Sequence, residues 1–123
     1  MAKLIYPELS YEIVGCVYDV YNSIGFGHQE RVYQVAVEKA LINKNIPFKR
    51  EVYIPVKFNQ ALVGKYYLDF LIDAKIILEL KIANVFYSKD VVQILAYLKA
   101  LKCRLGILIL FSKEGIKYKR IVN

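Results

Sequence analysis

The sequence is poor in the residues that build zinc and redox sites. Its 123 residues include one histidine, His28, and two isolated cysteines, Cys16 and Cys103. One histidine excludes a zinc site built on histidines, and two cysteines without metal-ligand spacing do not supply one either. We interpret both cysteines as buried thiols in a reducing, cytoplasmic environment, with a disulfide as the less favoured alternative.

Long apolar segments and phosphate-binding glycine loops are also missing. The uncharged runs are far too short to span a bilayer, and no basic segment followed by an apolar one opens the chain. We therefore expect no membrane partner and no secretion signal. The sequence contains no nucleotide-binding glycine loop and no nucleophile elbow. Its length predicts one compact domain over residues 1–123.

Positive charge is in excess. The chain has 18 Lys and Arg against 11 Asp and Glu, a formal net charge of +7. Such an excess favours a polyanionic partner, because lysines and arginines that meet phosphates release condensed counterions. A basic surface that only aids solubility explains the same excess equally well.

Hydrophobic periodicity predicts three helices and five strands. The helices are expected from the N-cap Ser10 to the stop at Gly25, over 28–43, and over 89–102 after the N-cap Ser88. The strands are expected near 49–58, 67–73, 76–81, 105–111 (central and buried) and 116–122. Pro55 indicates an edge position or a bulge in the first strand. The order α-α-β-β-β-α-β-β predicts an α/β sandwich with a mixed sheet.

Charged residues interrupt two runs that otherwise have the composition of buried strands. Asp69 lies in the first run, and Glu79 and Lys81 lie in the second. Burying a carboxylate without a partner costs roughly several kcal/mol, so these positions require an explanation. Two carboxylates and an ammonium at a strand pair can hold a divalent metal against a phosphodiester. A salt bridge between Lys81 and an acid on the same face is an equally good explanation of the Glu79–Lys81 triplet.

The turn between these strands decides whether the two carboxylates meet. Strand alternation places residues 67, 69, 71 and 73 on one face, and residues 77, 79 and 81 on one face. A two-residue turn pairs residue 69 with 80 and puts the acids on opposite sides of the sheet. A three-residue loop at 73–75, or a bulge, pairs 69 with 79. A metal site formed by both carboxylates therefore requires a loop with an odd number of residues, or a bulge.

If the carboxylates converge, a hard divalent cation such as Mg²⁺ is the expected cofactor. Asp69, Glu79 and the backbone carbonyl of Leu80 supply the oxygen ligands that such ions prefer. The ion would polarise a scissile phosphate and lower the pKa of a bound water. Lys81 would orient that water or neutralise charge that develops on the phosphate.

The helices carry further polar side chains. Glu30 lies in the first turn of the second helix, where a favourable interaction with the helix dipole is the commoner role. Gln93 and Tyr97 are four residues apart and share one helical face. The glutamine is either a satisfied core amide or a group that holds a metal-bound water or a phosphate. The lone His28 is expected to be a surface or capping group rather than a general base.

The last strand is basic. Lys117, Lys119 and Arg120 form either a solvated edge that blocks aggregation, which is the default, or a set of phosphate contacts.

Several of these residues, taken in order, resemble the GxxExxY protein family, a branch of the PD-(D/E)xK nuclease-like superfamily. The matching positions are Gly27-x-x-Glu30-x-x-Tyr33, Asp69, Glu79-Leu80-Lys81 and Gln93. The resemblance covers nearly the whole chain and implies a restriction-endonuclease-like α/β fold. It also implies that Glu30, Asp69 and Glu79 are metal ligands, that Lys81 is the catalytic lysine and that Gln93 is an accessory active-site residue.

We therefore expect a Mg²⁺- or Mn²⁺-dependent nuclease that acts on nucleic acid, DNA in preference to RNA. So small a domain has little surface for reading sequence, so we expect structure-selective or weakly specific cutting, with a homodimer presenting two sites to two strands. The main alternative is a non-catalytic nucleic-acid-binding module that retains the nuclease fold. The expected substrate contacts are Tyr33, Tyr97, Lys117, Lys119 and Arg120.

Overall fold

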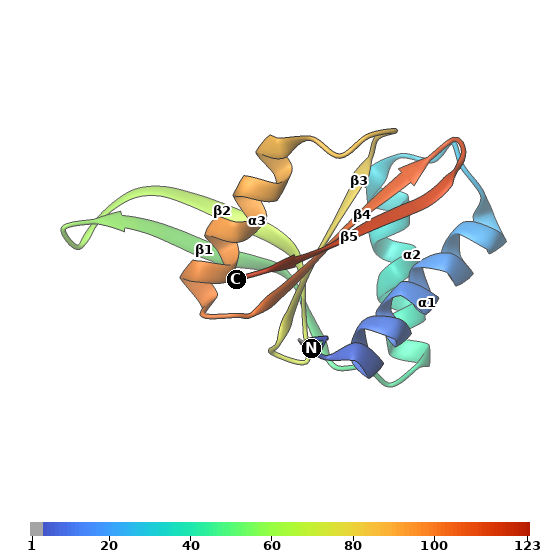
Figure 1. The fold of residues 1–123 in the computed structure, drawn as a ribbon, viewed down its shortest axis with the longest axis horizontal. Coiled ribbons are helices and arrows are strands. Elements are labelled where there is room, and N and C mark those ends of the chain that lie inside the picture. The colour runs from blue at the N-terminus through green and yellow to red at the C-terminus, as the bar shows by residue number, and fades with distance from the viewer. Residues whose placement is uncertain (1–3) are drawn as a thin grey trace.

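The computed structural model describes residues 4–123 (Figure 1). Within them the chain forms three helices and five strands in the predicted order α-α-β-β-β-α-β-β. The elements are α1 (Pro7–Ile24), α2 (Glu30–Asn43), β1 (Phe48–Phe58), β2 (Ala61–Ile72), β3 (Ile76–Ile82), α3 (Ser88–Leu101), β4 (Leu105–Ser112) and β5 (Gly115–Val122). In the described part of the chain, no helix has both the length and the apolarity needed to cross a bilayer.

The strands form one mixed sheet in the order β1-β2-β3-β4-β5. β3 and β4 run parallel, and the other neighbouring strands are antiparallel. The parallel pair requires a crossover connection, which α3 provides. All residues of β4 are buried, as predicted for 105–111, but β3 rather than β4 is the central strand. The predicted α/β fold with a mixed sheet is confirmed.

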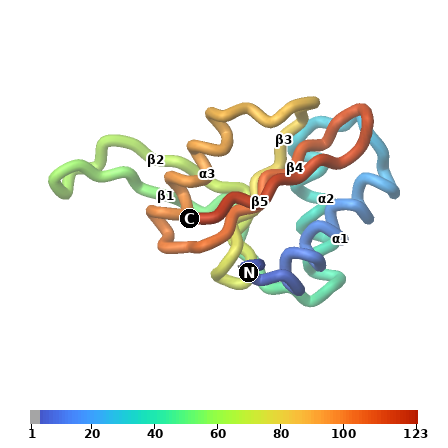
Figure 2. The backbone as a smooth tube through the Cα atoms, in the orientation of Figure 1, coloured from blue at the N-terminus to red at the C-terminus, as the bar shows by residue number. Residues whose placement is uncertain are grey.

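Helices cover both faces of the sheet (Figures 1 and 2). α1 and α2 bury one core against it, in which the ring of Tyr33 stacks on Phe111 with 4.0 Å between centroids. α3 buries a second core against the opposite face. There the helix approaches β4 so closely that a Cβ added to Gly106 would lie 2.6 Å from Cγ2 of Ile94. The three layers are therefore α1–α2, the sheet and α3.

The β1–β2 hairpin is longer than the other strand pairs and projects beyond α3 (Figure 2). Its turn residues, Asn59 and Gln60, have φ of 48° and 69°, as tight hairpin turns require. β1 is an edge strand, and its register shifts between Val56 and Lys57, one residue after Pro55. Both interpretations of this proline are therefore correct.

The helices begin at other residues than predicted. α1 begins at Pro7, a residue that favours the first helical position, and not after Ser10. The hydroxyl of Ser10 instead donates to the carbonyl one turn earlier, at 2.7 Å. α2 begins at Glu30, two residues later than predicted, and α3 includes Ser88 as its first residue. Gly25 ends α1 as predicted, with a φ of 73°.

Both cysteines are free and buried, as predicted. Cys16 lies in the core beneath α1 and α2, and Cys103 lies in the core beneath α3. The sheet separates these two cores, so the disulfide alternative is wrong.

Candidate active site

A three-residue loop joins β2 to β3. Ile72 pairs with Ile76, which leaves residues 73–75 in the loop. Asp73 and Ala74 have φ of 52° and 55°, and the N–H of Lys75 donates to Ile72 O at 2.9 Å. The prediction of an odd loop is confirmed, and the register places residue 69 opposite residue 79.

Asp69 and Glu79, named here the acid pair, are each held by the other's strand. The N–H of Asp69 donates to Oε1 of Glu79 at 3.1 Å, and the N–H of Leu80 donates to Oδ2 of Asp69 at 2.8 Å. The backbone pairing of β2 with β3 stops at Phe70 and Leu78, one residue short of the acid pair. Side-chain hydrogen bonds therefore take over where the strands separate, and the acid pair lies at this fork.

Side-chain alternation along β2 slips at the acid pair. Leu68 and Leu71 pack in the core beneath α3, whereas Phe70 packs in the core beneath α1 and α2. Strict alternation would put residues 68 and 70 on one face. The prediction that residues 67, 69, 71 and 73 share a face is therefore wrong. β1 is irregular at the same level, where Glu51 has a φ of 53°.

Burial makes the acid pair costly to ionise. Glu79 is only 5% exposed. Burial, and next the charge of Asp69, raise the pKa of Glu79 to about 8, and burial also raises the pKa of Asp69. Lys81 opposes both shifts, yet among residues 4–123 it forms no ion pair within 4.0 Å. The salt-bridge explanation of the Glu79–Lys81 triplet is therefore not supported.

Glu30 begins α2 near the acid pair. Its side chain is half-buried, and burial, followed by the charge of Asp69, raises its pKa. Lys81 and Asp90 also act on this carboxyl group. Glu30 therefore shares an electrostatic environment with the acid pair and with Lys81, although it comes from a different element.

The loop before Glu30 is anchored on both sides. Gly27 has a φ of 113°, a conformation that favours glycine. The hydroxyl of Tyr33 donates to Gly25 O at 2.6 Å, and Nε2 of His28 lies 2.8 Å from the carbonyl oxygen at the end of α1. His28 is exposed, as predicted, and its contact is with the end of α1 rather than with the start of α2. Tyr33 is fully buried, which does not support its predicted contact with substrate.

The predicted set of three metal-binding carboxylates is not assembled in this conformation. Within residues 4–123, no three His, Cys, Asp or Glu side chains come together closely enough to hold a metal ion. Asp69 and Glu79 are fixed by backbone hydrogen bonds, whereas Glu30 stays apart from them on α2. Repulsion between like charges disfavours the approach of a third carboxylate to the acid pair. The acid pair still offers the hard oxygen donors that Mg²⁺ prefers, so these two residues fit such an ion.

The sequence interpretation missed Gln34. This residue lies one helical turn after Glu30, and its Nε2 donates to Oδ1 of Asp69 at 3.3 Å. The spacing of four residues from Glu30 is the signal that would have placed it on the same face of α2.

α3 places Gln93 and Tyr97 on the opposite side of the sheet from α2. Both line a pocket of about 280 Å³ between α3 and the β1–β2 hairpin. The ring of Tyr97 lies 5.8 Å from that of Tyr66, measured between centroids. Burial, and next the charge of Glu79, raise the pKa of Tyr97 to about 12. The two predicted residues therefore both border this cavity, and Tyr97 also lies within electrostatic range of Glu79.

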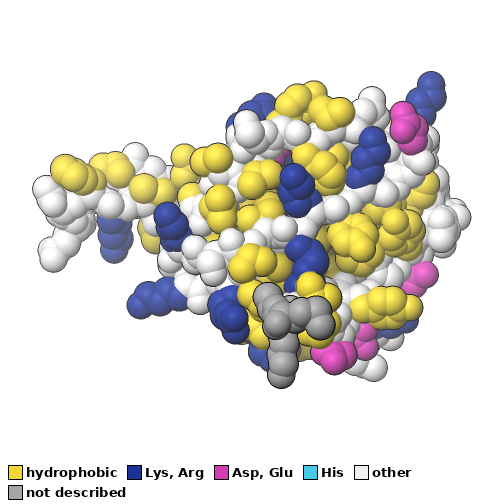
Figure 3. All heavy atoms as spheres, in the orientation of Figure 1, with side chains coloured by type: hydrophobic (Ala, Val, Ile, Leu, Met, Phe, Trp, Pro, Cys, Tyr) yellow, Lys and Arg dark blue, Asp and Glu magenta, His cyan; other side chains and the backbone are white. Residues whose placement is uncertain are grey.

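Lys117 and Lys119 of β5 lie on the α3 side of the sheet. Nζ of Lys117 donates to Asn84 O at 2.6 Å, and Nζ of Lys119 lies 5.3 Å from the ring centroid of Phe86. Both partners belong to the loop between β3 and α3. On the face of the molecule drawn in Figure 3, Lys and Arg side chains are widely spread, whereas most of the visible Asp and Glu side chains lie towards α1.

Arg120 has a structural role. Its guanidinium donates to Oγ of Ser10 and to the carbonyl of Ile5, so it ties β5 to α1. These contacts do not support the predicted contact of Arg120 with substrate.

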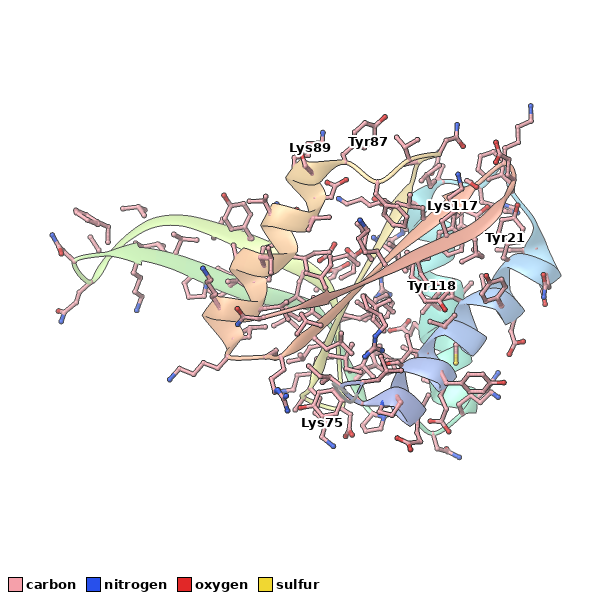
Figure 4. All side chains as sticks on the ribbon, viewed as in Figure 1. Tyr21, Lys75, Tyr87, Lys89, Lys117 and Tyr118 are labelled. Carbon is pink, nitrogen blue, oxygen red and sulfur yellow. The ribbon has the colours of Figure 1, made fainter. Side chains whose placement is uncertain are left out.

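Figure 4 shows where two other basic residues lie. Lys117 lies on β5, and Lys89 lies at the start of α3.

One comparison with known proteins identifies a superfamily. A family model described as the PD-(D/E)XK nuclease superfamily matches residues 7–121. The crystal structure of SSO0001 has a TM-score of 0.61 at 20% identity and covers 96% of this chain; this chain spans 59% of its length. An alkaline exonuclease (LHK-Exo) from Laribacter hongkongensis has a TM-score of 0.46 at 9% identity, with 100% and 72% of the two chains covered. No curated protein matches the sequence.

Proposed function

This chain belongs to the PD-(D/E)XK nuclease superfamily, and on this premise we propose that it is a Mg²⁺- or Mn²⁺-dependent nuclease that cuts DNA. One observation carries the proposal. The carboxylates of Asp69 and Glu79 meet at the fork between β2 and β3, and Lys81 follows Glu79 by two residues on β3. A buried pair of like charges is costly unless a cation neutralises it, and a hard divalent ion is such a cation.

In this proposal Asp69, Glu79 and the backbone carbonyl of Leu80 would hold the ion. Glu30 of α2 would complete the ligand set by moving towards the acid pair, because within residues 4–123 the three carboxylates do not come together. When bound, the ion supplies Lewis-acid stabilisation of the phosphate and a more acidic water. Lys81 stabilises the negative charge that develops on the phosphate in the transition state.

Two amides assist these charged groups. Gln34 donates to Oδ1 of Asp69 and so fixes the orientation of that carboxylate. Gln93 lies on α3, and its amide is a candidate to hold the attacking water or a phosphate oxygen. The two amides thus belong to helices on opposite faces of the sheet.

The basic residues on the α3 side give the nucleic acid a path to the acid pair. Lys81 pairs with Leu110 of β4, which pairs with Lys117 of β5. At about 4.8 Å between neighbouring strands, the Cα atoms of the two lysines are roughly 10 Å apart. A phosphate backbone that crosses the sheet here meets both ammonium groups. This path recognises charge and not sequence, so we propose weakly specific or structure-selective cutting, with a homodimer as the form that cuts two strands.

A non-catalytic nucleic-acid-binding module is the second candidate function. The position of Glu30 favours it, because within residues 4–123 the three predicted carboxylate ligands do not come together. Both functions use the same basic surface. Binding alone therefore does not separate them, and the reaction itself must be tested.

The test is cleavage of a labelled panel of single-stranded, duplex, flap and junction DNA, together with RNA, in Mg²⁺ or Mn²⁺. Wild type is compared with Lys81→Ala and with Lys75→Ala, which removes the same charge from an exposed loop position. We expect wild type and Lys75→Ala to cut, EDTA to stop the reaction, and Lys81→Ala to lose roughly 100- to 1,000-fold in rate. The Lys81→Ala variant should still bind, with its salt slope lowered by about one phosphate contact.

Two outcomes contradict the proposal. Equal cutting by wild type and Lys81→Ala would indicate a contaminating nuclease or a wrong role for Lys81. Binding that weakens with salt, without cutting by any preparation, would favour the binding module.

A further inference from the structure

The pocket between α3 and the β1–β2 hairpin has a defined wall on each side. Its volume is about 280 Å³. The hairpin contributes Ile54, Val56 and Tyr66, and α3 contributes Lys89, Val92, Gln93, Ala96, Tyr97 and Ala100. The walls are therefore mostly apolar, with two aromatic rings, one amide and one ammonium group. This is the composition of a small-ligand site in which a few polar groups fix the orientation.

The polar groups of this pocket are free to meet a ligand. Within residues 4–123, the amide of Gln93 and the hydroxyls of Tyr66 and Tyr97 form no hydrogen bond with protein groups. An amide both donates and accepts hydrogen bonds, as the edge of a nucleobase does. The two tyrosine rings are inclined by 56° to each other, so each offers its own surface.

The size and position of the pocket limit its occupant. Ligand pockets for drug-sized molecules are about 300–1,000 Å³, so this pocket takes one ring system and not a duplex. Tyr66 of the pocket precedes Asp69 by three residues on β2, which is about 10 Å along the strand. Lys89, at the start of α3, also lines the pocket, and its Nζ lies 5.8 Å from the ring centroid of Tyr87 (Figure 4). A group that enters here therefore lies close to the acid pair along β2.

We propose that this pocket takes one unstacked nucleobase of the strand whose phosphodiester lies at the acid pair. The base stacks on Tyr66, its edge forms hydrogen bonds with the amide of Gln93, and Lys89 contacts a flanking phosphate. The inference rests on the proposed function and adds a substrate class to it. A base enters the pocket only after it has left the helical stack, so single strands and frayed ends bind better than intact duplex.

The experiment measures binding with the non-cutting Lys81→Ala protein in Mg²⁺. The probe is a single-stranded DNA that carries one 2-aminopurine, whose fluorescence falls when it stacks on an aromatic ring, and the same sequence as a duplex. Tyr66→Ala is compared with Tyr66→Phe, which keeps the ring. Tyr67→Ala is the matched control, because Tyr67 pairs with Tyr53 on the other face of the hairpin.

We expect quenching with the single strand and weaker binding of the duplex. Tyr66→Ala should abolish the quenching and weaken single-strand binding roughly 5- to 150-fold, as loss of one stacked base does. Tyr66→Phe and Tyr67→Ala should keep both signals. Unchanged affinity and quenching in Tyr66→Ala, or equal affinity for the duplex, would overturn the proposal. So would a dimer that dissociates in Tyr66→Ala with DNA binding unchanged, because a second copy would then occupy the pocket.

Cleavage measured in parallel, with Lys81 intact, separates this inference from the proposed nuclease function. Loss of quenching in Tyr66→Ala, together with a wild-type protein that does not cut, would keep the base site and reject the nuclease. A wild-type protein that cuts, with an unchanged KM in Tyr66→Ala, would keep the nuclease and reject the base site.

Discussion

Replacing Glu79 by glutamine should make the metal-free protein more stable at alkaline pH. The substitution keeps the size of the side chain and an oxygen that can accept the hydrogen bond from the N–H of Asp69, which is 3.1 Å long in the wild type. It removes only the ionisable group. The difference between the two proteins therefore reports the free-energy cost of the buried charge at position 79.

The magnitude follows from the pKa of Glu79. Burial, and next the charge of Asp69, raise this pKa from 4.5 to about 8. The folded protein therefore holds the proton more tightly than the unfolded chain does. The resulting stability is complete below pH 4.5 and is lost as the pH rises through about 8. Each pH unit in this window costs about 1.4 kcal/mol, so wild type should lose roughly 3 kcal/mol between about pH 6 and pH 9.

The assay is urea unfolding in EDTA at both pH values. Glu114→Gln, in which an exposed side chain is changed, is the matched control. From pH 6 to pH 9, Glu79→Gln should gain roughly 3 kcal/mol over wild type and control, or roughly 10 °C in Tm. At pH 9, Mg²⁺ at about 100 times its Kd should restore about 2.7 kcal/mol to wild type. The variant should gain much less.

Parallel pH profiles for wild type and Glu79→Gln would refute the reasoning, because they would mean that Glu79 ionises as easily in the folded protein as in the unfolded chain. Equal stabilisation of both proteins by Mg²⁺ would show that the ion binds elsewhere.

Three further predictions concern Tyr33 and Arg120, whose predicted substrate contacts the structure does not support, and Lys119, whose contact stays a prediction. Tyr33→Phe should lower the free energy of unfolding by about 1–3 kcal/mol, because the carbonyl of Gly25 loses its partner, and urea unfolding measures this loss. An unchanged free energy would mean that the hydroxyl does not anchor the loop. Arg120→Ala should also destabilise the fold by about 1–3 kcal/mol and leave the salt dependence of DNA binding unchanged. Lys119→Ala should instead lower the salt slope by about one and leave stability nearly unchanged. The reverse pattern would make Arg120 the phosphate contact.

The helices and strands could be predicted because their signals are local. Alternating and helical periodicities and the glycine that ends α1 gave the right number and order of elements. The first residues of the helices could not be predicted as well. At α1, Pro7 and Ser10 both favour a start, and the serine hydroxyl bonds within the helix instead.

The candidate site was predictable as a set of alternatives. The sequence placed Asp69, Glu79 and Lys81 on adjacent strands and made the meeting of the carboxylates depend on one loop length. The three-residue loop then decided the register. The slip in alternation at residue 69 could not be predicted, because it follows from the separation of two strands that each look regular.

By itself, the sequence determined which chemical groups the chain carries, the order of its elements and the condition under which two acids converge. Only the tertiary structure decided that Asp69 and Glu79 meet, that Arg120 binds Ser10, and that Tyr66 and Tyr97 border one pocket. The physical reason is the separation of the partners along the chain. Periodicity reports which face of an element is buried, whereas these contacts depend on how distant elements pack against each other.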